Sequence, residues 1–258
     1  MDDEHQAAEL SPRAIAREVA LCAATLTLWP ILKDDARGTP DERMRALELA
    51  PLVGLAIGIA LAAIDRALAM LLLPATRSVT VLAIAFAAML GLPSRGIADT
   101  AEALRQGARV GPTGLSRIGP LGAIVAIAAF ALEAVVLARI TSPAGRASAI
   151  VMSQILGRFA IVPVAYGLRP LERWGLGLPY EIAVTFREFG VASVIALGLT
   201  TILYQNIGLI VVVAFAISIL LMRLVFSRRL GGVAGYTLGG ASAVAELTVL
   251  ATVAAMVR

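Results

Sequence analysis

The sequence predicts an all-α fold: a polytopic membrane helix bundle of about eight transmembrane helices, with its polar loops on the cytoplasmic face. Of its 258 residues, 59% are hydrophobic and only 16% are charged. Soluble domains are about 45–50% apolar and about 25% charged. The mean hydropathy is +0.86, and the apolar residues fall into long runs separated by polar segments. A run of about 20 apolar residues is what a membrane-spanning helix needs.

The chain divides into a polar tail, residues 1–12, and a single integral membrane domain, residues 13–258. In chain order, the expected spans are residues 14–32, 49–73, 78–92, 118–138, 147–168, 190–226 and 240–257. Because residues 190–226 are too long for one span, we divide them into two at Gln205 and Asn206. Residues 91–122 are predicted to be a polar loop, rich in glycine and arginine, that concentrates charged side chains at a membrane edge.

The basic residues predict how the chain is oriented. Most of the lysines and arginines fall in alternate loops, on the same side as residues 91–122. The positive-inside rule places that side in the cytoplasm of a bacterial-type inner membrane, with the N-terminus outside. The pI near 9.8 would also suit nucleic acid, but these residues are spread between hydrophobic segments, so we expect no nucleic-acid partner. The expected partners are membrane lipid and a membrane protein complex or a homo-oligomer.

The inventory of metal ligands is narrow. Cys22 is the only cysteine and His5 the only histidine. An intrachain disulfide and a zinc site of the usual kind are therefore excluded. A metal would need oxygen ligands, which indicates magnesium or a similar hard cation.

Asp99 and Glu102 are the acidic residues of the polar segment 91–122. Carboxylates three residues apart lie on one helical face, where they could share a magnesium ion that bridges substrate phosphates. The alternative is a helix start, in which Asp99 caps the helix and Glu102 completes a capping box. Spacing alone leaves both interpretations open.

Three further features stand out, of which the first two have both a functional and a structural interpretation. Ser116 and Arg117 precede a span, where they suit either a phosphate or an interfacial anchor. Arg158 lies inside a span, where a charge is costly, so we expect a functional role or a buried ion pair with Asp65, Glu246, Asp99 or Glu102. Gly54 and Gly58 have the small-xxx-small spacing of close helix packing, and we expect no chemistry there.

These segments together resemble the cobalamin-5'-phosphate synthase family, also called adenosylcobinamide-GDP ribazoletransferase. The resemblance covers nearly the whole chain in the right order, and no single motif in it is decisive. It is carried by TLTLWP (25–30), PLVGLAIG (51–58), GIADT (96–100), SRIG (116–119), GR (157–158), GLG (175–177), GG (231–232), Ala241 and Glu246.

The resemblance implies a reaction at the cytoplasmic membrane face. In that reaction, α-ribazole or its 5'-phosphate joins adenosylcobinamide-GDP, releasing GMP, with magnesium as cofactor. An alcohol attacks a phosphorus of the diphosphate, and a carboxylate takes the hydroxyl proton. Asp99 and Glu102 are then the expected catalytic residues and magnesium ligands. The expected substrate-binding residues are Arg95, Ser116, Arg117 and Arg158.

The chain departs from the family's pattern at the acidic positions. Arg95, Leu115 and Tyr236 stand where the pattern has aspartate, and Glu102 lengthens another aspartate. Loss of carboxylates should weaken magnesium binding. Two hypotheses therefore stay open: the family enzyme, and a catalytically silent relative that acts as a structural or accessory subunit or as a corrinoid-binding protein.

Overall fold

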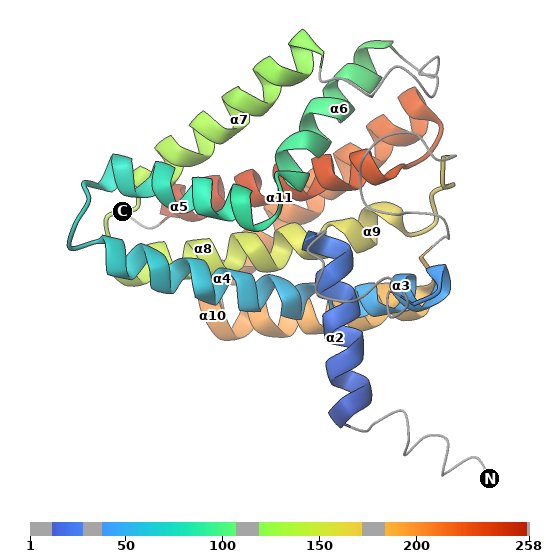
Figure 1. The fold of residues 1–258 in the computed structure, drawn as a ribbon, viewed down its shortest axis with the longest axis horizontal. Helices are drawn as coiled ribbons and strands as arrows, with labels where there is room; N and C mark the ends of the chain where they lie inside the picture. The colour runs from blue at the N-terminus through green and yellow to red at the C-terminus, as the bar shows by residue number, and fades with distance from the viewer. Residues whose placement is uncertain (1–11, 28–37, 107–118, 172–183, 257–258) are drawn as a thin grey trace.

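The structure is a computed structural model that describes residues 12–27, 38–106, 119–171 and 184–256. Its elements are helices, with no strand among the described residues, and most of them run side by side as a bundle (Figure 1). The predicted all-α fold is confirmed. In chain order the elements are α2 (Pro12–Thr27), α3 (Pro40–Ala46), the 3₁₀ turn η2 (Leu47–Leu49), α4 (Ala50–Leu68), α5 (Pro74–Ala88), α6 (Leu92–Gln106), α7 (Pro120–Arg139), α8 (Pro143–Phe159), α9 (Ile161–Ala165), α10 (Phe186–Val225), the π-helical turn η4 (Phe226–Leu230) and α11 (Gly235–Met256).

Local sequence signals explain where several helices begin. Proline occupies the start of α3, α5, α7 and α8, where its missing N–H costs nothing and its fixed φ suits the helix. Thr39 and Glu42 form a capping box at α3: the Thr39 N–H donates to Glu42 Oε2 at 2.8 Å, and the Glu42 N–H donates to Thr39 Oγ1 at 3.3 Å. This exchange satisfies backbone donors that a helix start leaves unpaired.

The number of membrane-capable helices is lower than the sequence predicted. The described residues contain six helices that are long and apolar enough to cross a membrane, or seven when the bent pair α5–α6 counts as one span. The prediction of eight is not confirmed. The six are Asp41–Leu68, Pro120–Arg139, Pro143–Ala165, Phe186–Leu203, Ile207–Leu230 and Gly235–Met256.

The long helix α10 provides two of these spans. Phe189 and Arg223 lie near its two ends, yet both line one cavity of about 400 Å³, together with Ala196 and Val212 from the middle of each half. The two halves therefore lie side by side and run in opposite directions. This arrangement confirms the division predicted at Gln205 and Asn206.

The first predicted span, residues 14–32, is not among the membrane-capable helices. The described part, α2, is 16 residues long and ends at Thr27, and residues 28–32 lie outside the described ranges. Arg17 and Glu18 are exposed on α2, and α2 crosses the direction of α4 steeply rather than running along it (Figure 1). The apolar run that suggested a span is partly used instead to bury Leu21 and Cys22 against the bundle.

The predicted loop at residues 91–122 is wrong for residues 92–106, which form α6. The third predicted span, residues 78–92, has the expected length but begins and ends four residues earlier, at Pro74 and Ala88. Helix α5 ends at Ala88, and the axis then bends by 84° into α6. The bend occurs at Leu90 and Gly91, which adopt φ values of 49° and 69°. A left-handed pair of residues interrupts the helix there, and α6 then runs as a separate amphipathic helix.

Gly54 and Gly58 lie where α4 packs against α8, which confirms their predicted role in packing. A Cβ added at Gly54 would lie 2.4 Å from the backbone oxygen of Gln154, and one at Gly58 would lie 2.8 Å from Cα of Val151. Backbone cannot move aside as a flexible side chain can. The close approach of these two helices therefore depends on glycine.

Replacing Gly54 by alanine is expected to destabilise the protein by about 1–3 kcal/mol through this overpacking. Thermal unfolding of the purified protein in detergent measures the effect. Gly198→Ala is the matched control, because Gly198 is also helical and a Cβ there meets nothing within 4 Å. That control should be neutral or slightly stabilising. Equal melting temperatures for Gly54→Ala and Gly198→Ala would contradict the packing argument.

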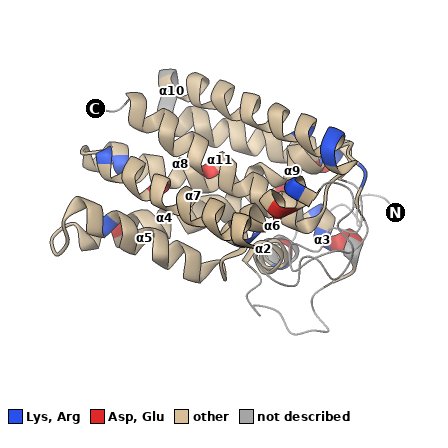
Figure 2. Ribbon diagram, turned by 90° about the horizontal axis from the view of Figure 1, so that it is seen from above, with Lys and Arg blue, Asp and Glu red and all other residues tan. Residues whose placement is uncertain are grey.

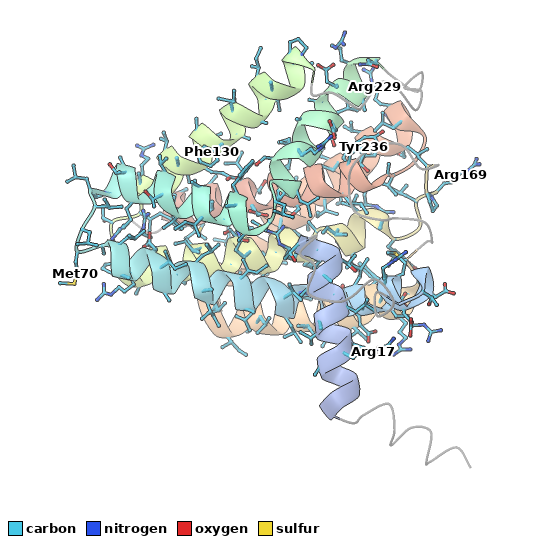
Figure 3. The ribbon with its side chains drawn as sticks, in the orientation of Figure 1. Arg17, Met70, Phe130, Arg169, Arg229 and Tyr236 are labelled. Atoms are coloured by element: carbon cyan, nitrogen blue, oxygen red, sulfur yellow. The ribbon has the colours of Figure 1, made fainter. Side chains whose placement is uncertain are left out.

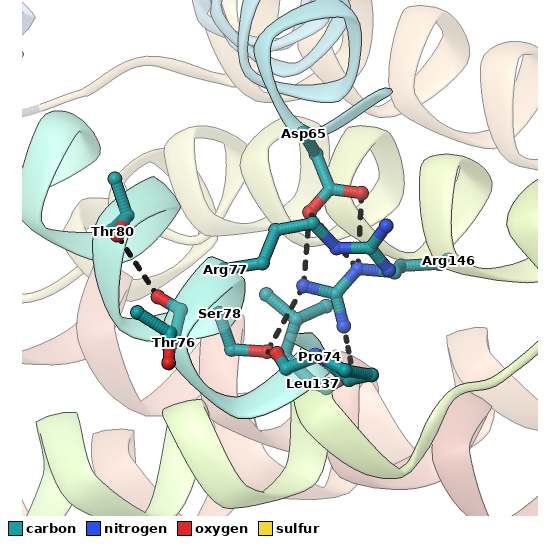
Figure 4. Close-up of polar contacts among 8 residues, drawn as sticks. All are labelled: Asp65, Pro74, Thr76, Arg77, Ser78, Thr80, Leu137 and Arg146. Atoms are coloured by element: carbon teal, nitrogen blue, oxygen red, sulfur yellow. Dashed lines mark hydrogen bonds and ion pairs between the residues drawn. The ribbon is translucent and has the colours of Figure 1, made fainter. Parts of the chain in front are cut away.

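A buried ion cluster joins four helices near one end of the bundle (Figure 4). Arg146 on α8 is 1% exposed, and its Nε donates to both oxygens of Asp65 on α4, at 2.9 and 3.0 Å. Its Nη2 donates to Ser78 Oγ on α5 at 2.9 Å, and its Nη1 donates to the carbonyl of Leu137 on α7. Arg77 Nε lies 3.4 Å from Asp65 Oδ1. We call Asp65, Arg77, Ser78 and Arg146 the α4–α8 clamp.

Charged residues gather toward the two ends of the bundle and leave its middle largely apolar (Figure 2). One end carries the α4–α8 clamp. The other end carries α3, α6 and the end of α10, and α6 holds Arg95, Asp99 and Glu102. That distribution is typical of a membrane-spanning bundle.

Candidate functional site at the contact of α6 and α11

The candidate site is built where α6 meets the start of α11. A Cβ added at Gly96 would lie 2.5 Å from the backbone of Gly239 and Gly240. The Thr100 hydroxyl donates to the carbonyl of Tyr236 at 3.2 Å. Glycines therefore allow the two backbones to touch, and this contact fixes the face of α6 that carries Asp99.

Asp99 is buried in this contact and is incompletely paired. It is 1% exposed, and its Oδ2 lies 3.6 Å from Arg95 Nε, one turn earlier on α6. Neither of these two atoms has a hydrogen-bond partner. The carboxylate is also close enough to the Tyr236 hydroxyl to interact with it electrostatically. A buried carboxylate with an unsatisfied oxygen is costly, and such atoms are found where a substrate or ion completes the bonding.

Glu102 lies on the same helix but has different partners. Its Oε1 accepts from the backbone N–H groups of Leu121 and Gly122 at 3.2 and 3.4 Å, in the first turn of α7. Its Oε2 accepts from Arg105 Nε at 2.8 Å. Glu102 therefore stabilises the start of α7, where a negative charge complements the helix dipole. The capping-box interpretation is wrong, because both acidic residues lie inside α6 and not at its start.

Arg158 lies well away from solvent and forms the buried ion pair that the sequence predicted. It is 2% exposed, and its Nη1 contacts Glu246 Oε1 at 3.1 Å and Ser242 Oγ at 2.6 Å, both on α11. Its Nη2 donates to Gln154 Oε1 at 3.0 Å. Among the four partners considered, Glu246 is the one it contacts. Its predicted contact with substrate phosphate stays a prediction.

Ser116 and Arg117 fall in residues 107–118, outside the described ranges, so their predicted roles stay predictions. The other predicted site residues are only partly brought together. Arg95 and Asp99 face each other, Glu102 turns toward α7, and Arg158 pairs inside the bundle with α11.

Sequence reasoning missed a group of exposed arginines near this contact, namely Arg169, Arg228 and Arg229. The turn η4, which carries Arg228 and Arg229, packs on α6. The segment with Arg169 is held against the start of α11, because the Val233 N–H donates to the Arg169 carbonyl at 3.0 Å. Figure 3 shows Arg169 and Arg229 at the same end of the bundle as Tyr236. The available signal was the pair Arg228 and Arg229, which come shortly before Gly231 and Gly232, whereas Arg169 is distant in the sequence and carried no such signal.

The magnesium ion that the resemblance implies does not fit the described residues. Magnesium is usually held by one or two carboxylates together with waters and substrate phosphates, in octahedral geometry. Of the two carboxylates on α6, Asp99 is the one with an oxygen that has no hydrogen-bond partner, and the charged group facing it is a guanidinium. Both Glu102 oxygens accept N–H groups. Within the described ranges, no three His, Cys, Asp or Glu side chains come together as metal ligands.

These features define a class: a polytopic helical membrane protein with an ion-paired, arginine-flanked carboxylate at one end of its bundle. Such a site suits an anionic, phosphate-bearing substrate. The family model described as cobalamin-5-phosphate synthase matches residues 18–254. The chain belongs to this family.

Three curated relatives share the name adenosylcobinamide-GDP ribazoletransferase. The Roseiflexus sp. (strain RS-1) protein is 32% identical over 209 residues, covering 78% of this chain and 76% of the relative. The Syntrophobacter fumaroxidans protein is 29% identical over 228 residues, covering 84% and 90%. The Sinorhizobium medicae protein is 29% identical over 254 residues, covering 92% and 95%. No solved structure matches the chain.

Proposed function

We propose that this protein is a membrane transferase that joins adenosylcobinamide-GDP to α-ribazole or its 5'-phosphate, with release of GMP, late in cobalamin biosynthesis. The observation that carries the proposal is the family match, which extends over residues 18–254 and so includes every described element of the candidate site. The names of the three relatives support the same reaction.

The described side chains suit particular parts of this reaction. The hydroxyl oxygen of α-ribazole forms a bond to the cobinamide-side phosphorus, and the bond from that phosphorus to the GMP oxygen breaks. GMP leaves with the bonding electron pair. Asp99 is the residue best suited to take the hydroxyl proton, because its Oδ2 has no hydrogen-bond partner. Arg95 is suited to offset phosphoryl charge, because guanidinium groups bind phosphate oxygens in a bidentate way.

The proposed site lies on the cytoplasmic face of the inner membrane. The support is the distribution of basic residues in the sequence. Arg95 and Arg105 also lie on α6, the helix that carries Asp99, and Arg228 and Arg229 lie on η4, which packs on α6. Nucleotide substrates are cytoplasmic, so this orientation brings substrate and site together.

Complementation tests the function. In a strain that lacks its cobalamin synthase and must grow on cobinamide, the wild-type gene is expected to restore growth. Asp99→Ala is expected to abolish the rescue, with the variant present in the membrane at the wild-type level. Purified protein should release GMP from adenosylcobinamide-GDP only when α-ribazole or its 5'-phosphate is added.

Failure of the wild type, with the protein verified in the membrane, would overturn the proposal for that host. The chain would then be better described as a catalytically silent relative, the second hypothesis drawn from the sequence. Rescue that survives Asp99→Ala would keep the activity but remove Asp99 from the reaction.

A further inference from the structure

Arg95 and Asp99 carry opposite charges and face each other on α6. The two atoms that face each other, Arg95 Nε and Asp99 Oδ2, form no hydrogen bond to any other group. Their Nε and Oδ2 atoms lie 3.6 Å apart, which is longer than a hydrogen bond, and both atoms are buried. Asp99 is 1% exposed at its side chain, whereas Arg95 is 30% exposed. The guanidinium therefore reaches from the buried carboxylate toward solvent, where a substrate can approach.

A guanidinium at this position can do part of what a divalent cation does. It carries a fixed positive charge and five N–H donors in a planar fork that matches two phosphate oxygens at once. Arg228 and Arg229 add exposed positive charge on η4, which packs against α6. The neighbouring carboxylate, Glu102, does not compete for Arg95, since its oxygens accept from Arg105 and from the start of α7.

The position of Arg95 beside Asp99 also accounts for the absence of a second carboxylate next to Asp99 on this face of α6. The resemblance implied an aspartate at position 95, and in this chain an arginine side chain stands there, beside Asp99. A cation placed between these two residues would be repelled by the guanidinium, at a distance where like charges interact strongly. The residues around Asp99 therefore do not suit magnesium because Arg95 is one of them.

We propose that Arg95 takes the place of a divalent cation, so that its guanidinium binds the diphosphate of the nucleotide substrate and the site needs no metal. This inference rests on the proposed function, because it takes the GDP-linked substrate as given. In the free protein Arg95 pairs with Asp99. When the diphosphate binds, Arg95 contacts the phosphate oxygens, and Asp99 Oδ2 is left free to accept the hydroxyl proton.

The first test is GDP binding by isothermal titration calorimetry, with the purified full-length protein in detergent. The wild type is expected to bind GDP with the same affinity in EDTA and in magnesium, within about twofold. Arg95→Ala should weaken binding by about 10–100-fold in both buffers, the equivalent of losing charge-assisted hydrogen bonds. Arg95→Lys should fall in between, because lysine offers a point charge and no fork.

Arg66→Ala is the matched control for these variants. Arg66 is an exposed arginine in the last turn of α4, next to Asp65 of the α4–α8 clamp, and its loss should leave GDP affinity unchanged. If Arg95→Ala does not fold, two measurements still test whether Arg95 binds the diphosphate without a metal. They are the wild-type comparison between EDTA and magnesium, and the affinity of Arg95→Lys.

The second test restores a carboxylate with Arg95→Asp. This variant is expected to gain Mn²⁺ binding, seen by electron paramagnetic resonance, since two carboxylates one helical turn apart can share such a cation. Its GDP binding should then require Mn²⁺. The wild type should show no specific Mn²⁺ signal.

Two results would overturn the inference: wild-type GDP binding that is lost in EDTA and returns with magnesium, or wild-type affinity in Arg95→Ala. Turnover separates this failure from failure of the proposed function. Release of GMP from adenosylcobinamide-GDP in magnesium but not in EDTA would keep the function and remove the metal-free site. Metal-free GDP binding with no turnover in either buffer would keep the Arg95 assignment and remove the function.

Discussion

Asp99→Asn is expected to lower the rate of GMP release by about 10²–10⁴-fold, the usual contribution of a positioned general base. Asparagine has nearly the same shape as aspartate, so the contact between α6 and α11 should persist. It has lost the charge that attracts Arg95 and the oxygen that would accept the hydroxyl proton. Single-turnover kinetics with purified protein, alongside a thermal unfolding curve, measures the effect and shows that the variant is folded.

Glu102→Gln is the matched control for this experiment. Both residues are buried carboxylates on α6, three positions apart, but the Glu102 oxygens accept from Leu121, Gly122 and Arg105. Glutamine retains an oxygen for the backbone of α7, so activity should stay within about threefold of wild type, as for a residue outside the reaction. A loss as large as that of Asp99→Asn would instead support the metal-ligand role that spacing predicted for Glu102.

Hydrophobicity was enough to predict most of the membrane spans. Helices α4, α7, α8 and α11 match predicted spans, because a run of about 20 apolar residues has few other stable uses. The failure at α6 has a physical cause. Helix α6 is rich in polar residues and contains Gly96, which looks like a loop residue until the backbone of Gly239 and Gly240 is brought against it. That contact joins residues far apart in the sequence, so local patterns do not contain it.

The candidate site could be predicted in its residues but not in its bonding. The sequence singled out Asp99 and Glu102 together, as one face of a helix. What separates them is the return of the chain at Leu121 and Gly122, which gives Glu102 backbone donors and leaves Asp99 with none. The pairing of Arg95 with Asp99 was predictable once residues 92–106 were taken as a helix, since four residues separate them.

The scaffold and the candidate site are expected to tolerate substitution to different degrees. Glycines at helix crossings, such as Gly54, Gly58 and Gly96, meet backbone at under 3.0 Å when a Cβ is added, so substitution there disturbs the whole bundle. A charge at position 95 meets no such restriction, because its side chain reaches solvent. A carboxylate and an arginine at that position are therefore both compatible with the fold, although the two would bind different groups.

Asp65→Ala is expected to be among the most destabilising single substitutions in the described part of the chain. It removes the carboxylate that pairs with Arg146, which is 1% exposed and hydrogen-bonded to Asp65, Ser78 and the carbonyl of Leu137. Removing one partner of a buried ion pair leaves an uncompensated charge and costs about 3–5 kcal/mol. Unfolding of the purified protein in detergent, followed by circular dichroism, gives the change in stability.

The Glu42→Gln variant provides the comparison, because Glu42 also pairs with an arginine, Arg17, but at the surface, where the two side chains are 39% and 58% exposed. Exposed pairs contribute little, so this variant should unfold close to wild type. The double variant Asp65→Leu with Arg146→Met should recover part of the loss, since apolar residues replace the most buried ion pair, while Arg77 still loses Asp65 as its partner. If Asp65→Ala were no less stable than Glu42→Gln, the α4–α8 clamp would not hold these helices together. The Arg146 guanidinium would then have to be hydrated in the folded protein, which its burial on all sides argues against.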